Sequence, residues 1–278
     1  MPNPLPQVSR PAQPLLIDFA GVTIVRGDRP VLRNLTLQIR RGEHVAILGA
    51  NGSGKSTLIK TITRELYPLD RGNRMRFRLL GQEDWDLSDL RGHLGIVTLD
   101  LLQSLSHEII LRQVTARELI LSGHFNSVGL WPHHRVTAAQ ERQARKILRF
   151  LEIAHLAQRP VSAMSSGEQR RVLIGRALVH EPEALILDEP TTSLDPGAVR
   201  EFRTLLRRLA RAGRSLILVT HHIADVIPEI GRVILMRDGR IVADGPKTRL
   251  LTSARLSRLF GTKLRVARRG QHFHLAEG

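Results

Sequence analysis

The sequence predicts an α/β fold, in which a mostly parallel sheet is combined with an N-terminal antiparallel β layer and a helical insertion. Short apolar runs at 45–48, 185–187 and 216–219 are typical of strands buried on both faces of a parallel sheet. Alternating apolar and polar residues before position 95 are typical of half-buried antiparallel strands. Between about Leu99 and Ser162, helical periods replace these strand patterns.

The first part of the chain divides into a leader and a β layer. Residues 1–14 carry five prolines and little apolar content, so we expect a disordered leader. Apolar and polar residues alternate over 34–39, and again over 75–79 behind a turn at 70–72. These two segments predict antiparallel strands with one buried face.

A glycine-rich loop follows the apolar run at 45–48 and opens a helix, with the spacing Gly-x4-Gly-Lys-Ser. Glycines allow several backbone N–H groups to point at one phosphate, and the helix N-terminus adds partial positive charge. Lys55 can reach the β- and γ-phosphates, and the Ser56 hydroxyl can bind Mg²⁺. A glycine-rich turn without a ligand is the alternative, which the preceding strand and following helix disfavour. The sequence therefore predicts a P-loop nucleotide-binding core formed by Gly49, Ala50, Asn51, Gly52, Ser53, Gly54, Lys55, Ser56 and Thr57.

Two residues in the helical insertion mark the beginnings of helices. Thr115 precedes a helix that ends near Gly123, and Thr137 with Gln140 forms a capping box before a second helix. After Pro160 the alternation of strands and helices returns, which implies right-handed parallel crossovers.

The end of the chain is predicted to contain a hairpin followed by short helices. Asp238-Gly239 lies between two apolar runs and predicts a two-residue hairpin. From Lys247 onward we expect one or two short helices and then a basic ending.

Two acids stand where the next apolar strand ends. Ala184–Leu187 predicts a buried strand, and Asp188 and Glu189 follow it directly. Ligands of open parallel sheets bind at this carboxyl edge. Asp188 is placed to hold Mg²⁺ and Glu189 to orient and deprotonate an attacking water. The alternative is that these are two loop acids without a ligand. Their position directly after an apolar strand, downstream of a phosphate loop, disfavours it.

The charge of the chain is strongly basic, with 42 Lys plus Arg against 26 Asp plus Glu and a formal net charge of +16. Such an excess suits nucleic acid, an anionic membrane surface or an acidic partner. Aromatic stacking platforms for single strands are scarce, since the chain has one Tyr and two Trp. Five arginines lie opposite an apolar stripe in the helix predicted over 196–211, and we expect mostly a solvated face from Arg200, Arg203, Arg207, Arg208 and Arg211.

The chain has no cysteine, which excludes a disulfide framework and a thiolate metal site. No apolar run approaches the roughly 18–20 residues that cross a bilayer, and the N-terminus lacks the order of a secretory signal. We therefore expect a soluble protein that can dock on a membrane partner.

The stretch Met164-Ser165-Ser166-Gly167-Glu168 predicts a second helix N-terminus suited to an anion. Together with the phosphate loop and the acids at 188–189, it resembles the ABC-type ATPase family, whose signature reads Leu-Ser-Gly-Gly-Gln. Three of the five positions differ, but Ser165 and Gly167 are kept. Ser193-Leu194-Asp195 is similar to the family's D-loop, and His221 to its switch histidine. The resemblance runs from about Leu15 to Gly245.

The resemblance implies an ATPase domain over 15–246, with a helical subdomain at about 99–165 and a helical, basic extension over 247–278. ATP and Mg²⁺ would bind between two chains packed head to tail, closing the pair, and hydrolysis would open it. Glu189 and His221 would be catalytic. The partner's contribution to the nucleotide site would come from Ser165, Ser166, Gly167, Glu168 and Asp195.

Two positions depart from the family pattern. Where the family usually places an aromatic residue against adenine, this chain has Arg26, which can stack on a base or simply be solvated. The glutamine that senses Mg²⁺ in the family would fall near Leu99, and the nearest candidate is Gln103. We expect no metal role for His133-His134 and no catalytic role for His222.

Transport is the leading function that the resemblance implies. The chain would be the ATP-hydrolysing subunit of a transporter at the cytoplasmic face, docking on permease chains through the helical insertion and pairing with a second copy or a related ATPase. Its ending through 259–261 and Val266 is similar to ATPases of importers for metal chelates, cobalamin or oxyanions such as molybdate. The alternatives are a soluble ABC-type ATPase acting on nucleic acid or the ribosome, which the +16 charge favours slightly, and a binding module without turnover, which Glu189 disfavours. Soluble ATPases of this kind typically carry two ATPase domains or a long coiled-coil insertion, and neither pattern fits this sequence. We therefore expect no direct contact with nucleic acid.

Overall fold

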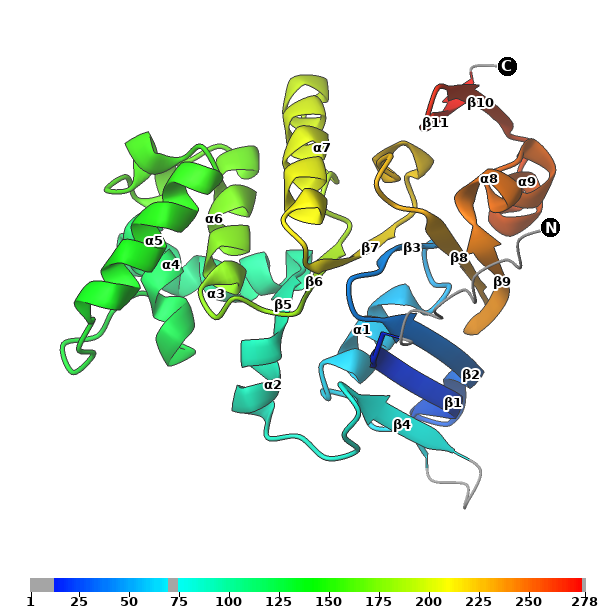
Figure 1. The fold of residues 1–278 in the computed structure, drawn as a ribbon, viewed down its shortest axis with the longest axis horizontal. Helices are drawn as coiled ribbons and strands as arrows, with labels where there is room; N and C mark the ends of the chain where they lie inside the picture. The colour runs from blue at the N-terminus through cyan, green and yellow to red at the C-terminus, as the bar shows by residue number, and fades with distance from the viewer. Residues whose placement is uncertain (1–12, 70–74, 277–278) are drawn as a thin grey trace, which may run out of the picture.

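The computed structural model describes residues 13–69 and 75–276, without the side chains of 99–100 and 102–105. Nearly all of the predicted leader and the predicted turn at 70–72 lie outside these residues. The described chain forms a three-stranded antiparallel sheet, a six-stranded mostly parallel sheet and a C-terminal hairpin. The helices within residues 99–178 gather at one end of the molecule, away from the antiparallel sheet, whereas the helix over 55–62 lies beside that sheet (Figure 1). The predicted fold class is confirmed.

The antiparallel sheet has the order β2-β1-β4 and is built from β1 (Leu15–Arg26), β2 (Arg29–Arg40) and β4 (Arg76–Leu79). Alternate residues of β2 are buried, as the predicted half-buried strand requires. Phe19 of β1 and Phe77 of β4 pack with ring centroids 4.8 Å apart. The sheet's apolar face therefore forms part of a core.

The larger sheet has the order β5-β6-β7-β3-β8-β9 and is parallel except for its last strand. Its strands are β3 (His44–Leu48), β5 (Leu94–Val97), β6 (Ala184–Asp188), β7 (Ser215–Thr220), β8 (Arg232–Arg237) and β9 (Arg240–Pro246). Leu48 pairs with Thr220, and Asp188 with Val219. The ends of β3, β6 and β7 therefore meet at one edge, which is where ligands bind in such sheets.

Each face of the parallel sheet contributes to a different apolar core. Val45 and Ile47 of β3 join a cluster with the antiparallel sheet and with α1 (Lys55–Ile62). Ala46 and Leu48 join a second cluster with the helical part of the chain. This double burial is why the strands read as continuous apolar runs rather than alternating ones.

The turn between β8 and β9 is the predicted two-residue hairpin. Asp238 and Gly239 have φ values of 50° and 73°, the left-handed conformations of a type I′ turn. Arg237 pairs with Arg240 across it. A side chain at Gly239 would place its Cβ 2.0 Å from the Val31 carbonyl oxygen, so this turn packs directly on β2.

The helical insertion follows α2 (Leu87–His93) and β5. It comprises α3 (Leu99–Leu111), α4 (Ala116–Leu121) and α5 (Ala138–Phe150), with short 3-10 helices η1 (Ser122–Phe125), η2 (Ala154–Leu156) and η3 (Val161–Ala163). The capping box of Thr137 and Gln140 is confirmed, and Thr115 forms another with Glu118. Both α5 and α6 (Ser166–Leu178) pack against α4, and α6 also reaches β5. Helix α6 thus links the insertion to the sheet.

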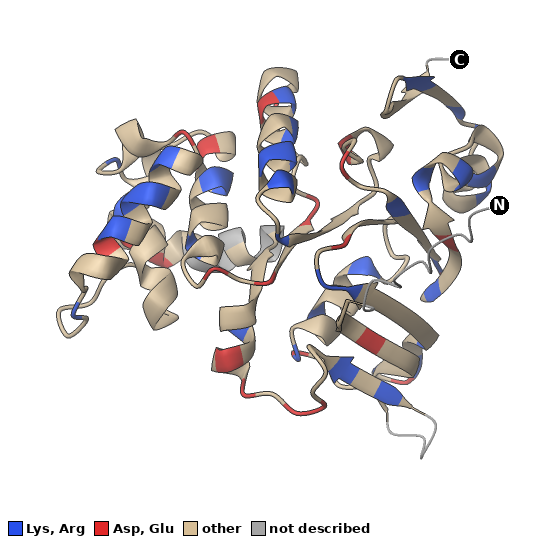
Figure 2. Cartoon of the chain, in the orientation of Figure 1, with Lys and Arg blue, Asp and Glu red and all other residues tan. Residues whose placement is uncertain are grey.

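The arginines predicted to form a mostly solvated face on α7 (Pro196–Arg211) are partly exposed, but several of them also form ion pairs that the sequence does not predict. Arg203 pairs with Asp225, and Arg207 and Arg211 both pair with Glu229. Arg208 pairs with Glu152. Figure 2 shows the basic residues running along α7. Much of this charge is therefore matched by acids from neighbouring segments, which a helix read alone does not reveal.

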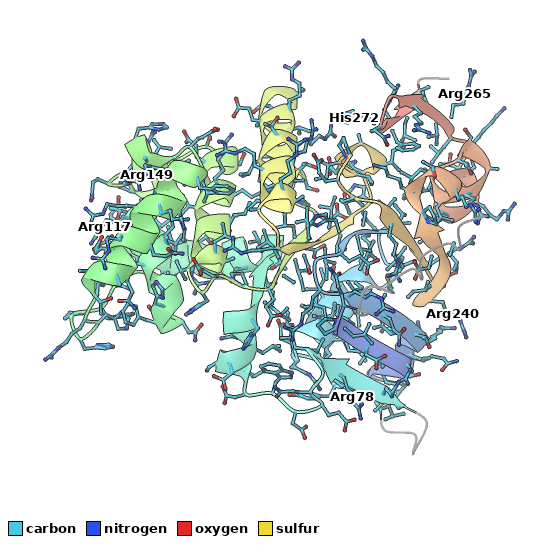
Figure 3. The ribbon with its side chains drawn as sticks, viewed as in Figure 1. Arg78, Arg117, Arg149, Arg240, Arg265 and His272 are labelled. Carbon is cyan, nitrogen blue, oxygen red and sulfur yellow. The ribbon has the colours of Figure 1, made fainter. Side chains whose placement is uncertain are left out.

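The C-terminal extension is only partly as predicted. Two short helices, α8 (Lys247–Leu250) and α9 (Ser253–Phe260), are present as predicted, and the basic ending after them forms a hairpin of β10 (Arg265–Arg269) and β11 (His272–Ala276) that was not predicted. Figure 3 shows Arg265 and His272 on this hairpin. Strand β11 packs against the short helix η4 (Ile223–Asp225). None of the helices in the described part of the chain combines the length and apolar content of a membrane span.

Candidate functional site

The phosphate loop between β3 and α1 is shaped by its glycines. Gly52 and Gly54 have φ values of 78° and 101°, which residues with a Cβ rarely adopt. A Cβ at Gly49 would lie 2.4 Å from Ser53 Oγ and 2.5 Å from the Met236 carbonyl oxygen. The predicted glycine pattern is therefore a requirement of this backbone.

The Lys55 side chain lies inside the loop and is only 6% exposed. Its Nζ donates to the carbonyl oxygens of Gly49 at 2.8 Å and Ala50 at 3.1 Å. It also lies 3.6 Å from Glu189 Oε1. Among the residues that the structure describes, Ser53 Oγ is buried here without a hydrogen-bond partner. A buried ammonium and an unpaired hydroxyl beside backbone N–H groups suit a phosphate group.

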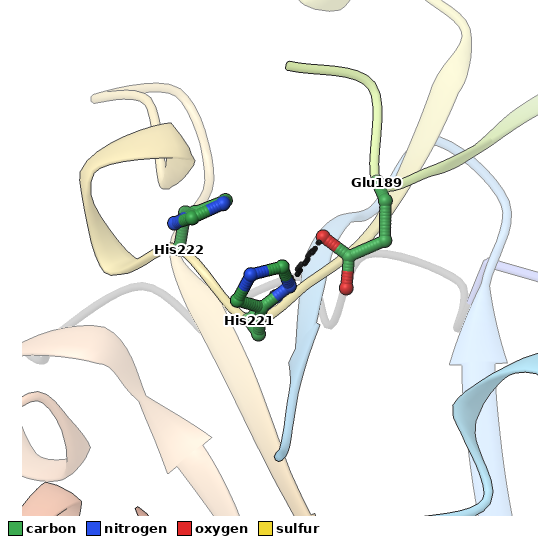
Figure 4. A group of neighbouring side chains, drawn as sticks. All are labelled: Glu189, His221 and His222. Carbon is green, nitrogen blue, oxygen red and sulfur yellow. Dashed lines mark hydrogen bonds and ion pairs between the residues drawn. The ribbon is translucent and has the colours of Figure 1, made fainter. Parts of the chain in front are cut away.

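The two predicted acids stand at the end of β6, beside the loop. Glu189 has a φ of 47°, an uncommon conformation for a non-glycine residue, and its backbone N–H donates to the Val219 carbonyl oxygen at 2.8 Å. Its Oε2 lies 2.8 Å from His221 Nδ1 and accepts from Thr220 Oγ1 at 3.2 Å (Figure 4). The structure therefore brings Lys55, Glu189 and His221 together, as the sequence predicts.

Ser56 and Asp188 line one cavity of about 470 Å³. Thr98 and Leu101, at the start of α3, line it too, as does Arg176 of α6. A hydroxyl and a carboxylate supply the oxygen donors that Mg²⁺ prefers. These two residues fit the metal role that the sequence assigns to them.

A second group of possible metal ligands lies nearby, but we assign no metal to it. One ligand atom each from Glu189, His221 and His222 lie within 4.8 Å of one another (Figure 4). However, the Lys55 ammonium already lies beside Glu189 Oε1, and the N–H of His221 donates to Oε2 at 3.3 Å. A metal cation here would compete with that ammonium for the same carboxylate.

The signature-like stretch forms the N-terminus of α6. Ser165 is the N-cap, and its N–H donates to Glu168 Oε2 at 2.8 Å. This backbone hydrogen bond from Ser165 lowers the pKa of the Glu168 carboxyl below its ordinary value. Ser165 and Ser166 are exposed and Gly167 is half-buried, so this helix end is accessible.

The two anion-binding elements face different openings. Ser165 and Gly167 line a cavity of about 210 Å³ together with Ala198 of α7. Within the described part of the chain, this cavity shares no lining residue with the one at Ser56 and Asp188. The predicted phosphate loop and the signature-like helix end therefore lie at two separate cavities of one chain.

The remaining predicted site residues are Asp195, Arg26 and Gln103. Asp195 caps α7, and its Oδ1 accepts from the N–H groups of Gly197 and Ala198, which lowers the pKa of Asp195. Arg26 is exposed at the end of β1. Gln103 belongs to α3, and its side chain lies outside the described residues. Its predicted metal role, like the adenine contact of Arg26, stays a prediction.

Sequence reasoning missed two buried charges that shape the site. The Arg170 guanidinium of α6, 4% exposed, donates to the carbonyl oxygens of Pro190 and Thr192, which closely follow Asp188 and Glu189 in the chain. Asp225 in η4 is fully buried and pairs with Arg203. The sequence does show an arginine next to Arg171 and an acid within an apolar stretch, both of which could have been flagged as buried charges. Their hydrogen-bond partners, however, lie 20 or more residues away in the sequence.

Comparison with known proteins decides the family. A family model described as "ABC transporter" matches residues 32–192. A putative ABC transporter ATP-binding protein of Streptococcus mutans is 30% identical over 253 residues, covering 90% of this chain and 94% of that protein. The chain belongs to the ABC transporter family. It is an ATP-binding subunit of this family, and ATP-binding subunits of ABC transporters hydrolyse ATP in a reaction coupled to transport.

Solved ABC transporter structures share the fold. The structure of cbiO1 from Clostridium perfringens, described as part of the ABC transporter complex cbiONQ, is 28% identical with a TM-score of 0.72, covering 88% of this chain and 94% of that one. A bacterial ABC transporter cassette solved as a dimer is 26% identical with a TM-score of 0.63, covering 83% of this chain and 98% of that one. The fold and the family membership therefore agree.

Proposed function

We propose that two ATPase chains pack head to tail and enclose each ATP between the Lys55 loop of one copy and the Ser165 helix end of the other. One observation carries this proposal: the two half-sites of a single chain open on separate cavities, and both are accessible. The dimeric state of a related cassette supports it. The γ-phosphate, held from both sides, would favour the closed pair.

The hydrolysis step is assigned to Glu189. Its carboxylate takes a proton from a water molecule whose oxygen forms a bond to the γ-phosphorus. The bond from that phosphorus to the β–γ bridging oxygen breaks, and ADP and phosphate are the products. Lys55 neutralises charge that develops on the phosphate oxygens, and His221, held against Glu189, supplies a second polar contact to the γ-phosphate.

Ser56 and Asp188, with Gln103 as the third predicted ligand, would hold Mg²⁺. When bound, the ion supplies charge neutralisation at the β- and γ-phosphates. From the second copy, Ser165, Ser166, Gly167 and Glu168 would contact the nucleotide through the N-terminus of α6. Asp195 would contribute to the nucleotide site by capping α7. Arg26 would contribute by stacking its guanidinium plane on the adenine of ATP.

The membrane partner would be a separately encoded permease, which places the chain at the cytoplasmic face of a membrane. The helical side of the molecule, α3 to α6, is the proposed docking surface (Figure 1). The description of cbiO1 as part of a transporter complex supports a multi-chain assembly of this kind. The second ATPase is either another copy or a related subunit.

The shared site is tested by Ser165→Arg. A long cation at this helix end would block the second half-site while leaving the Lys55 loop of the same chain intact. We expect ATP binding by the separate chain to persist and hydrolysis to fall at least about tenfold, since one contact to the transition-state phosphate is lost. Ser162→Arg, at an exposed position in the same segment, is the matched control. Equal hydrolysis by both variants would contradict the shared site.

A further inference from the structure

We propose that Asp225 is a positioning residue for ATP hydrolysis, which holds the Glu189 loop, the end of β7 and helix α7 in one arrangement. This inference rests on the proposed role of Glu189 as the base. Asp225 does not reach the nucleotide-binding loop itself. It acts through its neighbours.

The Asp225 carboxylate is fully buried and satisfied from several segments. Its Oδ1 accepts from Arg203 Nε at 3.1 Å and Nη2 at 2.9 Å. Its Oδ2 accepts from Thr191 Oγ1, and Thr220 Oγ1 lies at 3.4 Å. A buried charge is costly unless it is paired and hydrogen-bonded, so these contacts specify one arrangement of the segments.

Each partner belongs to a segment that the reaction uses. Thr191 lies two residues after Glu189, in the loop whose carbonyl oxygens Arg170 also holds. Thr220 directly precedes His221. Arg203 lies on α7, which begins beside Asp195. Asp225 therefore connects the base, the switch histidine and the D-loop helix through one carboxylate.

The Thr220 hydroxyl is the link to the reacting group. It has a single proton and two acceptors, Glu189 Oε2 at 3.2 Å and Asp225 Oδ2 at 3.4 Å. The shorter distance favours donation to Glu189, while Thr191 donates to Asp225 Oδ2. Removing the Asp225 charge would release Arg203 and rearrange the donors around Oδ2, which shifts the orientation of the Glu189 carboxylate.

The chain provides a matched control in Glu229. This acid also pairs with α7, through Arg207 at 3.1 Å and Arg211 at 2.7 Å, and it comes from the same stretch of chain as Asp225. These ion pairs lie one and two turns beyond Arg203 along α7 and involve neither Thr191 nor Thr220. A variant of Glu229 weakens the attachment of α7 without touching the residues around Glu189.

The test compares steady-state ATP hydrolysis by the wild-type chain, Asp225→Asn and Glu229→Gln, with KM and kcat measured separately. Because small displacements of a catalytic group are costly, we expect Asp225→Asn to lower kcat at least about tenfold with KM for ATP within about twofold of wild type. Glu229→Gln should keep the wild-type kcat. Equal kcat in all three proteins, or equal loss in both variants, would overturn the inference.

A second pair of variants guards against a folding defect in Asp225→Asn. Thr191→Val removes the hydroxyl that donates to Asp225, whereas Thr191→Ser keeps it. We expect kcat to fall in Thr191→Val and to be restored in Thr191→Ser, at similar melting temperatures. Unchanged kcat in Thr191→Val overturns the inference. A wild-type chain without ATP hydrolysis would instead contradict the proposed function, and this inference with it.

Discussion

At the scale of single residues, the site depends on groups whose chemistry is local in the sequence. Asp188 is the last residue of β6 and Glu189 follows it, while Lys55 opens the helix after the loop that follows β3. The parallel sheet brings the ends of these strands to one edge. This is why the sequence alone places them correctly relative to one another. The contacts of Arg170 and Asp225 depend on partners from distant segments, so only the three-dimensional structure reveals them.

Replacing Glu189 by Gln tests the assignment of the base. The amide keeps the shape of the side chain but cannot take a proton from water, so we expect kcat to fall by about 10²–10⁴ while ATP stays bound. The trapped nucleotide should hold two chains together, which light scattering would detect as a dimer. Glu181→Gln, at an exposed position before β6, is the control. Hydrolysis by Glu189→Gln at the wild-type rate would remove Glu189 from this role.

At the scale of elements, capping explains where the helices of the insertion begin. The sequence predicts the box at Thr137 and Gln140 because its signal spans only four residues. The C-terminal hairpin was not predicted, because β10 has the sequence Arg-Val-Ala-Arg-Arg and lacks the alternation of apolar and polar residues that is typical of a strand. Phe273 of β11, 5% exposed, anchors the hairpin in the core.

The capping box of α6 predicts a pH dependence of stability. The hydrogen bond from the Ser165 N–H lowers the folded-state pKa of Glu168 below its ordinary value of 4.5. The charged form therefore stabilises the fold fully above about pH 4.5, and this contribution is lost as the pH falls through the lowered pKa.

We expect the wild type to melt at a higher temperature than Glu168→Gln at pH 6 and the gap to narrow below about pH 4, as the pKa shift implies. Thr137→Ala serves as the control, because its box uses the neutral Gln140 and should lose about 1 kcal/mol with no acid-dependent narrowing. A gap between wild type and Glu168→Gln that stays constant across the acid range would contradict the role of the charge.

At the scale of the whole molecule, the net charge of +16 is a poor guide to the partner. Along α7, four of the arginines pair with acids from other segments, so they do not form a free basic face. The family relationship supports transport, whereas the charge had slightly favoured a nucleic-acid role. Composition counts charges but does not locate their partners.

The shared nucleotide site is the central claim, and a directed cross-link tests it most directly. The chain has no cysteine, so single cysteines report on chosen positions without background. In the Glu189→Gln background, Asn51→Cys would mark the phosphate loop of one chain and Ser166→Cys the helix end of another; both positions are exposed.

Mixing these two proteins with ATP and a mild oxidant should give a disulfide-linked species of twice the 31.2 kDa chain mass, formed only when both proteins and ATP are present. The account predicts this ATP-dependent mixed dimer. A mixture that stays monomeric, or in which each protein cross-links to itself as readily as to the other, would contradict it.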